Sequence, residues 1–146
     1  MQIINTANIE EARKKIKDSK EKPIIVKAQD ENFNRKILEY GKFDILLFPS
    51  QTKKKYSLKY MDSSLNHVLA KIATKNNLSI GFDMSSIKDL EKKQKAIELS
   101  RIRQNIKICR KAKTKIKILN YKDGRGVSSF LISLGASTQQ AKEAVS

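Results

Sequence analysis

Residues 23–49 read PIIVKAQDENFNRKILEYGKFDILLFP, with two apolar segments on either side of one amphipathic segment. Residues 24–26 form a short apolar run typical of a buried strand, and residues 43–48 form the strongest such run in the chain. Between them, Asp30 is placed to cap a helix that ends at Gly41. A strand, a helix and a second strand in this order predict a βαβ unit with parallel strands.

The same alternation continues over the rest of the chain. Further strands are expected at residues 2–5, 78–82 and 115–119, and residues 122–126 are expected to form a turn. The predicted element order is β-α-β-α-β-α-β-α-β-α-α, which indicates an α/β domain with a mostly parallel sheet over residues 1–146.

Helix boundaries follow from capping residues and from changes in the apolar face. Asn8 with Glu11 is typical of a capping box, Asp62 or Ser63 is expected to cap a helix, and residue 137 another. The apolar face changes within residues 85–112, which predicts a kink or two helices meeting near Ser100.

The charge of the chain is strongly positive and unevenly distributed. Its 31 Lys and Arg residues outnumber 15 Asp and Glu residues, and the formal net charge is +16. Residues 101–118 hold eight of the basic residues and no carboxylate. Leu99, Ile102, Ile106 and Cys109 repeat at helical spacing in the same region, which predicts a packed helix with a cationic flank. Such a surface favours a polyanion, and nucleic acid is the commonest polyanion in a cell.

Several classes of function are disfavoured by the residue inventory. His67 and Cys109 are the single histidine and the single cysteine, so a zinc cluster and an intrachain disulfide are excluded. The sequence contains no glycine-rich nucleotide-binding motif, no apolar run of membrane-spanning length and no secretory signal pattern. We therefore expect a cytoplasmic protein without catalytic residues, metal or cofactor of its own.

The candidate binding residues are cations on ordered elements and in one loop. Arg103, Lys107 and Arg110 are spaced i, i+4, i+7, which places them on one ridge that can bridge phosphates. The alternative for this ridge is a solvated face that only keeps the protein soluble. A lysine-rich loop is another candidate, and its alternative is a plain surface loop. The helix flank with His67 and the basic turn are further candidates. Their alternatives are a histidine with a structural hydrogen bond and an ordinary tight turn. These further residues are Lys53, Lys54, Lys55, His67, Lys71, Lys122 and Arg125.

Four segments in order resemble the ribonuclease P protein component 3 family. They are FDILLFP at residues 43–49, LNHVLAKIA at 65–73, NLSIGFD at 77–83 and SRIRQNIKICRK at 100–111. Upstream, residues 24–30 followed by Asn34 and Arg35 resemble the preceding strand of the family and its Asn-Arg pair. The ordered set carries the resemblance, because each motif alone is less specific than a set of metal ligands.

This resemblance implies a fold and a function. It implies a TIM-barrel-like fold and a protein subunit of ribonuclease P, the endoribonuclease that removes the 5′ leader from precursor tRNA. In this family the RNA performs the reaction, with Mg²⁺ expected on the RNA component. The implied partners are the ribonuclease P RNA, protein component 2 and precursor tRNA, with a homodimer possible within a heterotetramer. Carried over by position, the implied contacts are Asn34, Arg35, His67, Lys71, Arg101, Arg103, Asn105, Lys107 and Arg110.

The chain also departs from the family in length. A closed eight-stranded barrel needs about 250 residues, whereas this chain has 146 and about five strand signals. We therefore expect a truncated, incomplete barrel with an exposed edge that a partner covers. The alternative functions are a generic RNA-binding or ribosome-associated protein and a small phosphoesterase, which a single histidine disfavours.

Overall fold

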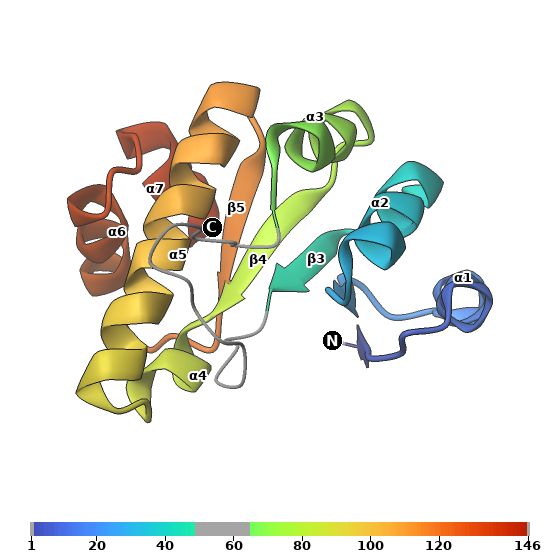
Figure 1. Cartoon of the computed structure of the whole chain (residues 1–146), viewed down its shortest axis with the longest axis horizontal. Coiled ribbons are helices and arrows are strands. Elements are labelled where there is room, and N and C mark those ends of the chain that lie inside the picture. The colour runs from blue at the N-terminus through green and yellow to red at the C-terminus, as the bar shows by residue number, and fades with distance from the viewer. Residues whose placement is uncertain (1, 49–64, 146) are drawn as a thin grey trace.

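The computed structural model of the chain describes residues 2–48 and 65–145, which form a parallel sheet flanked by helices (Figure 1). Across the sheet the strand order follows the chain order, β1-β2-β3-β4-β5, and every neighbouring pair is parallel. The strands are β1 Gln2–Ile4, β2 Ile24–Lys27, β3 Ile45–Phe48, β4 Ser79–Asp83 and β5 Lys115–Leu119. The helices are α1 Ile9–Asp18, α2 Glu31–Tyr40, α3 His67–Lys75, α4 Met84–Lys88, α5 Lys92–Ala112, α6 Gly124–Ser133 and α7 Thr138–Ala144. The predicted alternation and the parallel sheet are confirmed.

One row of aliphatic side chains crosses the sheet on the face that the connecting helices cover. Ile4, Val26, Leu46, Ile80 and Ile116 are register partners from β1 to β5, and each is at most 1% exposed. They join one core with buried side chains from the helices. Parallel neighbours joined by right-handed crossovers place their connecting helices on the same face, which explains why this core is continuous.

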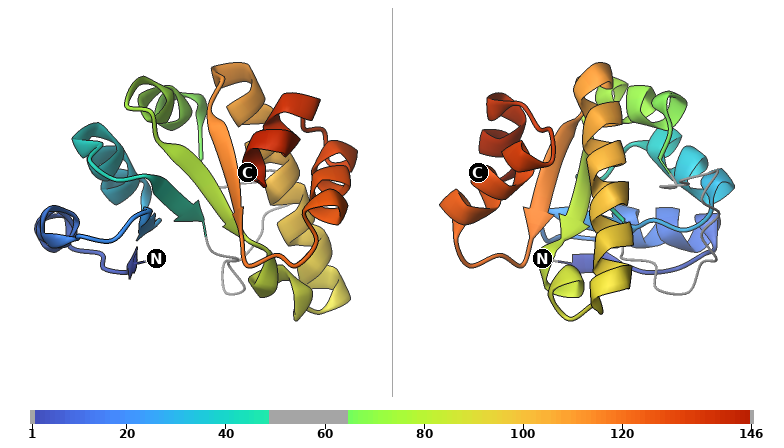
Figure 2. Two further views of the ribbon diagram at one scale, coloured as in Figure 1. Left: turned by 180° about the vertical axis from the view of Figure 1, so that it is seen from behind. Right: turned by 60° about the vertical axis from the view of Figure 1, so that its left-hand side comes forward.

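The opposite face of the sheet carries a smaller cluster and then turns polar. Ile25, Ile45 and Leu47 are buried together, with Leu119 packed against them. Toward β5 a hollow of about 670 Å³ is lined in part by Lys115 and by residues of α7, which packs along β5 (Figure 2). Among the residues described, β1 and β5 each pair with one neighbour only, so the sheet is open, as the predicted incomplete barrel requires.

Two predicted features of the helices are wrong. Asn66 caps α3, with its Oδ1 accepting the N–H of Leu69 at 2.9 Å, in place of the predicted Asp62 or Ser63, which lie outside the described residues. Helix α5 runs without a break through Ser100, and the interruption lies earlier, at residues 89–91 between α4 and α5. Leu90 lies in this interruption, outside α5.

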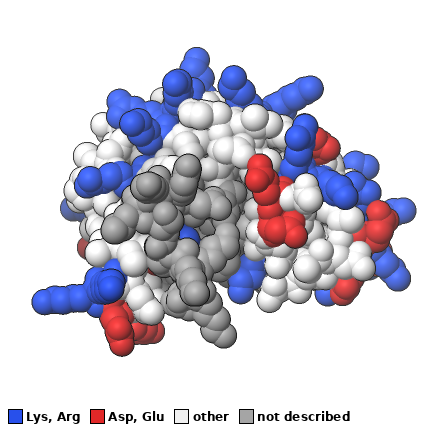
Figure 3. All heavy atoms as spheres, viewed as in Figure 1, with Lys and Arg blue, Asp and Glu red and all other residues white. Residues whose placement is uncertain are grey.

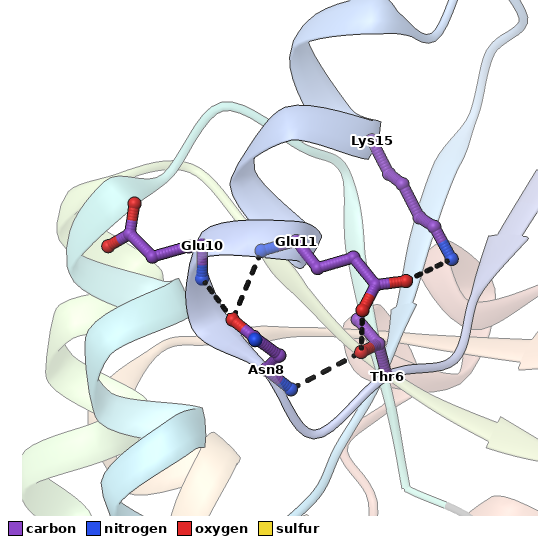
Figure 4. A network of polar contacts seen from close by, with 5 residues as sticks. All are labelled: Thr6, Asn8, Glu10, Glu11 and Lys15. Atoms are coloured by element: carbon purple, nitrogen blue, oxygen red, sulfur yellow. Dashed lines mark hydrogen bonds and ion pairs between the residues drawn. The ribbon is translucent and has the colours of Figure 1, made fainter.

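The start of α1 is only half of the predicted capping box (Figure 4). Asn8 Oδ1 accepts the N–H groups of Glu10 at 3.0 Å and Glu11 at 3.3 Å. The N–H of Asn8 donates to Thr6 Oγ1 at 3.2 Å, while the Glu11 carboxylate accepts the Thr6 hydroxyl at 3.1 Å and pairs with Lys15 at 3.0 Å. The hydrogen bonds from Lys15 and Thr6 lower the pKa of the Glu11 carboxyl.

Two further boundaries shift by a few residues. Asp44 lies just before β3 instead of inside a strand, and its Oδ2 accepts the N–H of Ile24 at 2.7 Å. The expected turn at residues 122–126 is in part the first turn of α6, where Asp123 Oδ1 accepts the N–H of Arg125 at 3.1 Å. By contrast, Ser137 caps α7 as predicted and forms a complete capping box with Gln140.

We expect Gly81→Ala to destabilise the fold, because a Cβ at Gly81 on β4 would lie 2.6 Å from Ile45 Cγ2. Overpacking of a core typically costs about 1–3 kcal/mol of unfolding free energy, which urea denaturation measures. Gly124→Ala is the control, because its Cβ would meet Tyr121 at an ordinary 3.7 Å. An unchanged urea midpoint for Gly81→Ala would show that Ile45 moves aside freely.

Candidate nucleic-acid interface

The predicted basic ridge is present on α5. Arg103, Lys107 and Arg110, which we call the α5 ridge, are all exposed. Together with residues 133–135 at the end of α6 they line a hollow of about 300 Å³. Arg110 Nη1 donates to the carbonyl of Gly135 at 3.3 Å, which fixes one of the three guanidinium and ammonium groups against the neighbouring segment. At 1.5 Å rise per residue the ridge spans about 10 Å of the helix axis.

The buried flank of α5 orients the ridge. Ile102, Ile106 and Cys109 are at most 5% exposed and belong to the main core. With 100° between successive residues, a helix held by these positions turns the ridge toward α6 and solvent. Burial also raises the pKa of the Cys109 thiol to about 12, so the thiol stays protonated at neutral pH and is a packing residue.

The α5 ridge lies in surroundings that favour an anionic ligand. Within residues 2–48 and 65–145, ion pairs link Arg13 to Glu10, Lys15 to Glu11, Arg35 to Glu39 and Arg101 to Glu98, and none of these involves the ridge. In Figure 3, lysine and arginine side chains gather along the upper edge, over the C-terminal ends of α5 and α3, while the visible carboxylates lie lower or to the right. The ridge thus takes part in none of these ion pairs, and a carboxylate, that of Glu143, lines a hollow with Arg110 that is separate from the one lined by the whole ridge.

Helix α3 extends this basic edge. Its exposed side chains include His67, Lys71 and Lys75, and the helix contains no carboxylate. A hydroxyl network holds its C-terminal end against α5 and the start of β5. Thr74 Oγ1 lies 3.0 Å from the Ala112 carbonyl and 2.7 Å from Thr114 Oγ1. The C-terminal ends of α3 and α5 therefore lie side by side, and they carry the exposed Lys75 and Lys111.

Three predicted contact residues are not on the surface, and this corrects the sequence-based expectation. Asn34, Arg101 and Asn105 are 0%, 6% and 3% exposed. Asn34 Oδ1 accepts the N–H of Gln29 at 2.8 Å, and its Nδ2 donates to the carbonyl of the same residue at 3.3 Å. These are structural hydrogen bonds between the end of β2 and α2, because a buried amide needs partners inside the protein.

The remaining predicted residues are dispersed. Arg35 is exposed and paired with Glu39 at 3.2 Å on α2. Lys122 and Arg125 are exposed at the start of α6, at the opposite end of that helix from the ridge. Because the carboxylate of Asp123 already accepts an N–H there, the turn is less suited to a phosphate than predicted. Lys53, Lys54 and Lys55 lie outside the residues that the structure describes.

Some surface cations near the ridge were not selected as contacts from the sequence. Lys75, Lys111 and Lys113 are exposed at the C-terminal ends of α3 and α5. Their presence in a carboxylate-free run is the signal that points to them. Gly135, in contrast, contributes only a backbone carbonyl, and no feature of its sequence neighbourhood indicates that α5 lies beside it.

Two negative findings apply to the described part of the chain. It contains no group of three or more His, Cys, Asp or Glu side chains placed to hold a metal ion. None of its helices combines the length and apolarity that crossing a membrane requires.

Comparison with known proteins shows which proteins share this fold. A chain in a structure described as archaeal ribonuclease P with mature tRNA superposes with a TM-score of 0.78 over 97% of this chain and 62% of its own length, at 24% sequence identity. The fold is therefore that of a known α/β chain, and the open sheet corresponds to part of it. No protein-family model matches the sequence.

Two relatives with similar sequences have the same name. Ribonuclease P protein component 3 of Methanococcoides burtonii is 35% identical over 88 residues, 60% of this chain and 33% of that protein. The protein of the same name from Methanococcus maripaludis strain C7 is 27% identical over 117 residues, 79% of this chain and 47% of that protein. The chain is thus a homologue of ribonuclease P protein component 3 over the aligned residues, which confirms the resemblance. It spans between a third and about half of the length of these relatives.

We expect Asn34→Ala to weaken the fold without removing an RNA contact. Loss of a buried hydrogen-bonding side chain costs about 1–3 kcal/mol, measurable by urea denaturation. Arg35→Ala is the neighbouring control, because the exposed pair with Glu39 contributes at most about 1 kcal/mol. An Asn34→Ala protein of unchanged stability that binds RNA more weakly would instead identify Asn34 as a contact.

Proposed function

We propose that this chain is a protein subunit of ribonuclease P that binds the RNA of the enzyme through the α5 ridge. The observation that carries the proposal is a carboxylate-free ridge on a packed helix, in a chain homologous to protein component 3. Phosphate contacts by Arg and Lys supply affinity and position, and they need no catalytic group on the protein. In this proposal the RNA performs the removal of the 5′ leader of precursor tRNA, with Mg²⁺ held by the RNA.

Order in the ridge supports a docking role better than a purely solubilising one. Arg110 is held by the Gly135 carbonyl, and α3 is tied to the C-terminal end of α5 by the Thr74 and Thr114 hydroxyls. Cations on ordered helices lose less conformational freedom when they bind than cations on a loose tail. The edge formed by α5 and α3 is therefore suited to a folded RNA surface.

A protein partner is the second part of the proposal. Among the described strands β1 and β5 have one neighbour each; α7 packs along β5, whereas Ile3 on β1 is 44% exposed. Such edges favour association. We propose that protein component 2 or a second copy of this chain covers an edge of the sheet, within an assembly such as a heterotetramer.

The partner proposal predicts association in solution. Sedimentation velocity of the chain alone, and of the chain mixed with protein component 2 from the same host, should show a dimer or a mixed complex. A folded chain that remains a monodisperse monomer in both samples would contradict the proposal that an edge of the sheet needs a partner.

The RNA proposal predicts a gain of function in a reconstituted enzyme. Addition of the chain to ribonuclease P RNA and the other protein subunits of its host should raise the rate of precursor-tRNA cleavage at limiting Mg²⁺. A variant with Arg103, Lys107 and Arg110 all changed to Ala should give much less of this gain. Each phosphate contact contributes about 0.7–0.9 to the steepness of log affinity against log salt. The salt dependence of RNA binding by this triple variant should therefore be less steep by about 2.

The control for this variant removes the same charge elsewhere. Lys14, Lys17 and Lys20 are exposed on or just after α1, and their joint replacement by Ala should leave the slope nearly unchanged. Equal slopes for the two triple variants would show that the ridge is not the contact surface. RNA binding without any gain in cleavage would favour the second candidate, a generic RNA-binding protein that uses the same edge.

A further inference from the structure

A second hollow lies along the same side of α5 as the ridge. It has a volume of about 490 Å³ and lies between α4, the N-terminal half of α5 and α6. Its floor is apolar and partly aromatic, with Met84, Ile87, Leu99, Tyr121, Val127 and Phe130 among the lining residues. Tyr121 and Phe130 are half-buried, so their rings are partly accessible. No part of the proposed function uses this surface.

Lysines surround the apolar floor. Lys88, Lys95 and Lys122 line the hollow from α4, α5 and the segment before α6, and Asp123 is the carboxylate among the lining residues. An apolar floor with a cationic rim fits a ligand that has flat apolar faces and negative charge on one molecule. RNA bases attached to phosphates have this combination, since bases stack on aromatic side chains while the backbone tracks cations.

The apolar hollow and the α5 ridge follow one another along the same two helices. On α5, Lys95, Leu99 and Arg103 are spaced i, i+4, i+8, so the first two line the apolar hollow and the third lines the basic one. On α6, Phe130 lines the apolar hollow, and Ser133, almost one turn later, lines the basic one. From Lys95 to Arg110 the distance along the helix axis is about 22 Å at 1.5 Å per residue.

We propose that the groove between α5 and α6 binds a single-stranded segment of RNA. A base stacks in the apolar hollow against Phe130 and Tyr121, and neighbouring phosphates lie on Lys95 and on the α5 ridge. This inference rests on the proposed function for the source of the RNA, but its stacking contacts are separate from the ridge. A duplex keeps its base faces inside the stack and would use the cations only.

A protein helix fits this groove less well. An amphipathic helix docks through apolar side chains over several turns, whereas here the apolar floor gives way to three cations after Leu99. Along the groove an apolar lining is followed by a cationic one, which matches an RNA base in the first hollow and backbone phosphates in the second.

The test uses a short uridine-rich RNA with one 2-aminopurine, either single-stranded or annealed to its complement. The single strand should bind the full chain at least about tenfold more tightly than the duplex, and 2-aminopurine fluorescence should be quenched on binding because the base stacks. Phe130→Leu keeps the apolar volume and removes the aromatic ring. This variant should lose most of the quenching and about fivefold to tenfold in single-strand affinity, the lower range of stacking effects.

Ile132→Ala is the control, because Ile132 lies on α6 outside both hollows and is 46% exposed. It should bind and quench as the unaltered chain does. Equal affinity for single strand and duplex with unquenched fluorescence would overturn the groove proposal while leaving the ridge as an RNA contact. No measurable binding of either RNA would overturn both. A photo-crosslinker at position 130 that reacts with a protein subunit instead of RNA in the reconstituted enzyme would also overturn the groove proposal.

Discussion

Burial of one aliphatic row across the parallel sheet positions the other parts of the molecule. Ile4, Val26, Leu46, Ile80 and Ile116 lie side by side in register, nearly without solvent contact, and the connecting helices pack onto them. Since each strand neighbours the next strand in the chain, these helices must cross on the same face. Helix α5 is the longest of the described helices, and its buried flank is held by this core. Its cations consequently face outward.

The same residue types serve different purposes at different positions of α5. Arg101 is buried and lies 3.5 Å from the buried carboxylate of Glu98, because a charge inside a protein requires a partner. Arg103, two positions later, is exposed and borders a basic hollow. A change of about 200° around the helix thus separates a structural arginine from a candidate RNA contact.

The open sheet connects the fold with the relatives of the chain. The superposed chain from archaeal ribonuclease P is longer, and this chain covers 62% of it. Five parallel strands in chain order form an arc of a TIM-barrel-like fold without closure, which leaves two edges and a partly polar face near β5. The partner proposed for an edge and the RNA proposed for the α5–α6 groove would occupy different surfaces, so both can bind the same molecule.

The sequence by itself determined the alternation of strands and helices, the parallel sheet and the basic flank of α5. Apolar periodicity and capping residues are local signals, and they specify Asp30, Gly41 and Ser137 as helix boundaries without any knowledge of packing. Only the tertiary structure decided that Asn34 and Asn105 are buried and that Gly135 and Phe130 lie beside α5. Burial and neighbourhood depend on how distant elements pack, and residue type or spacing along one helix does not encode which other element covers it.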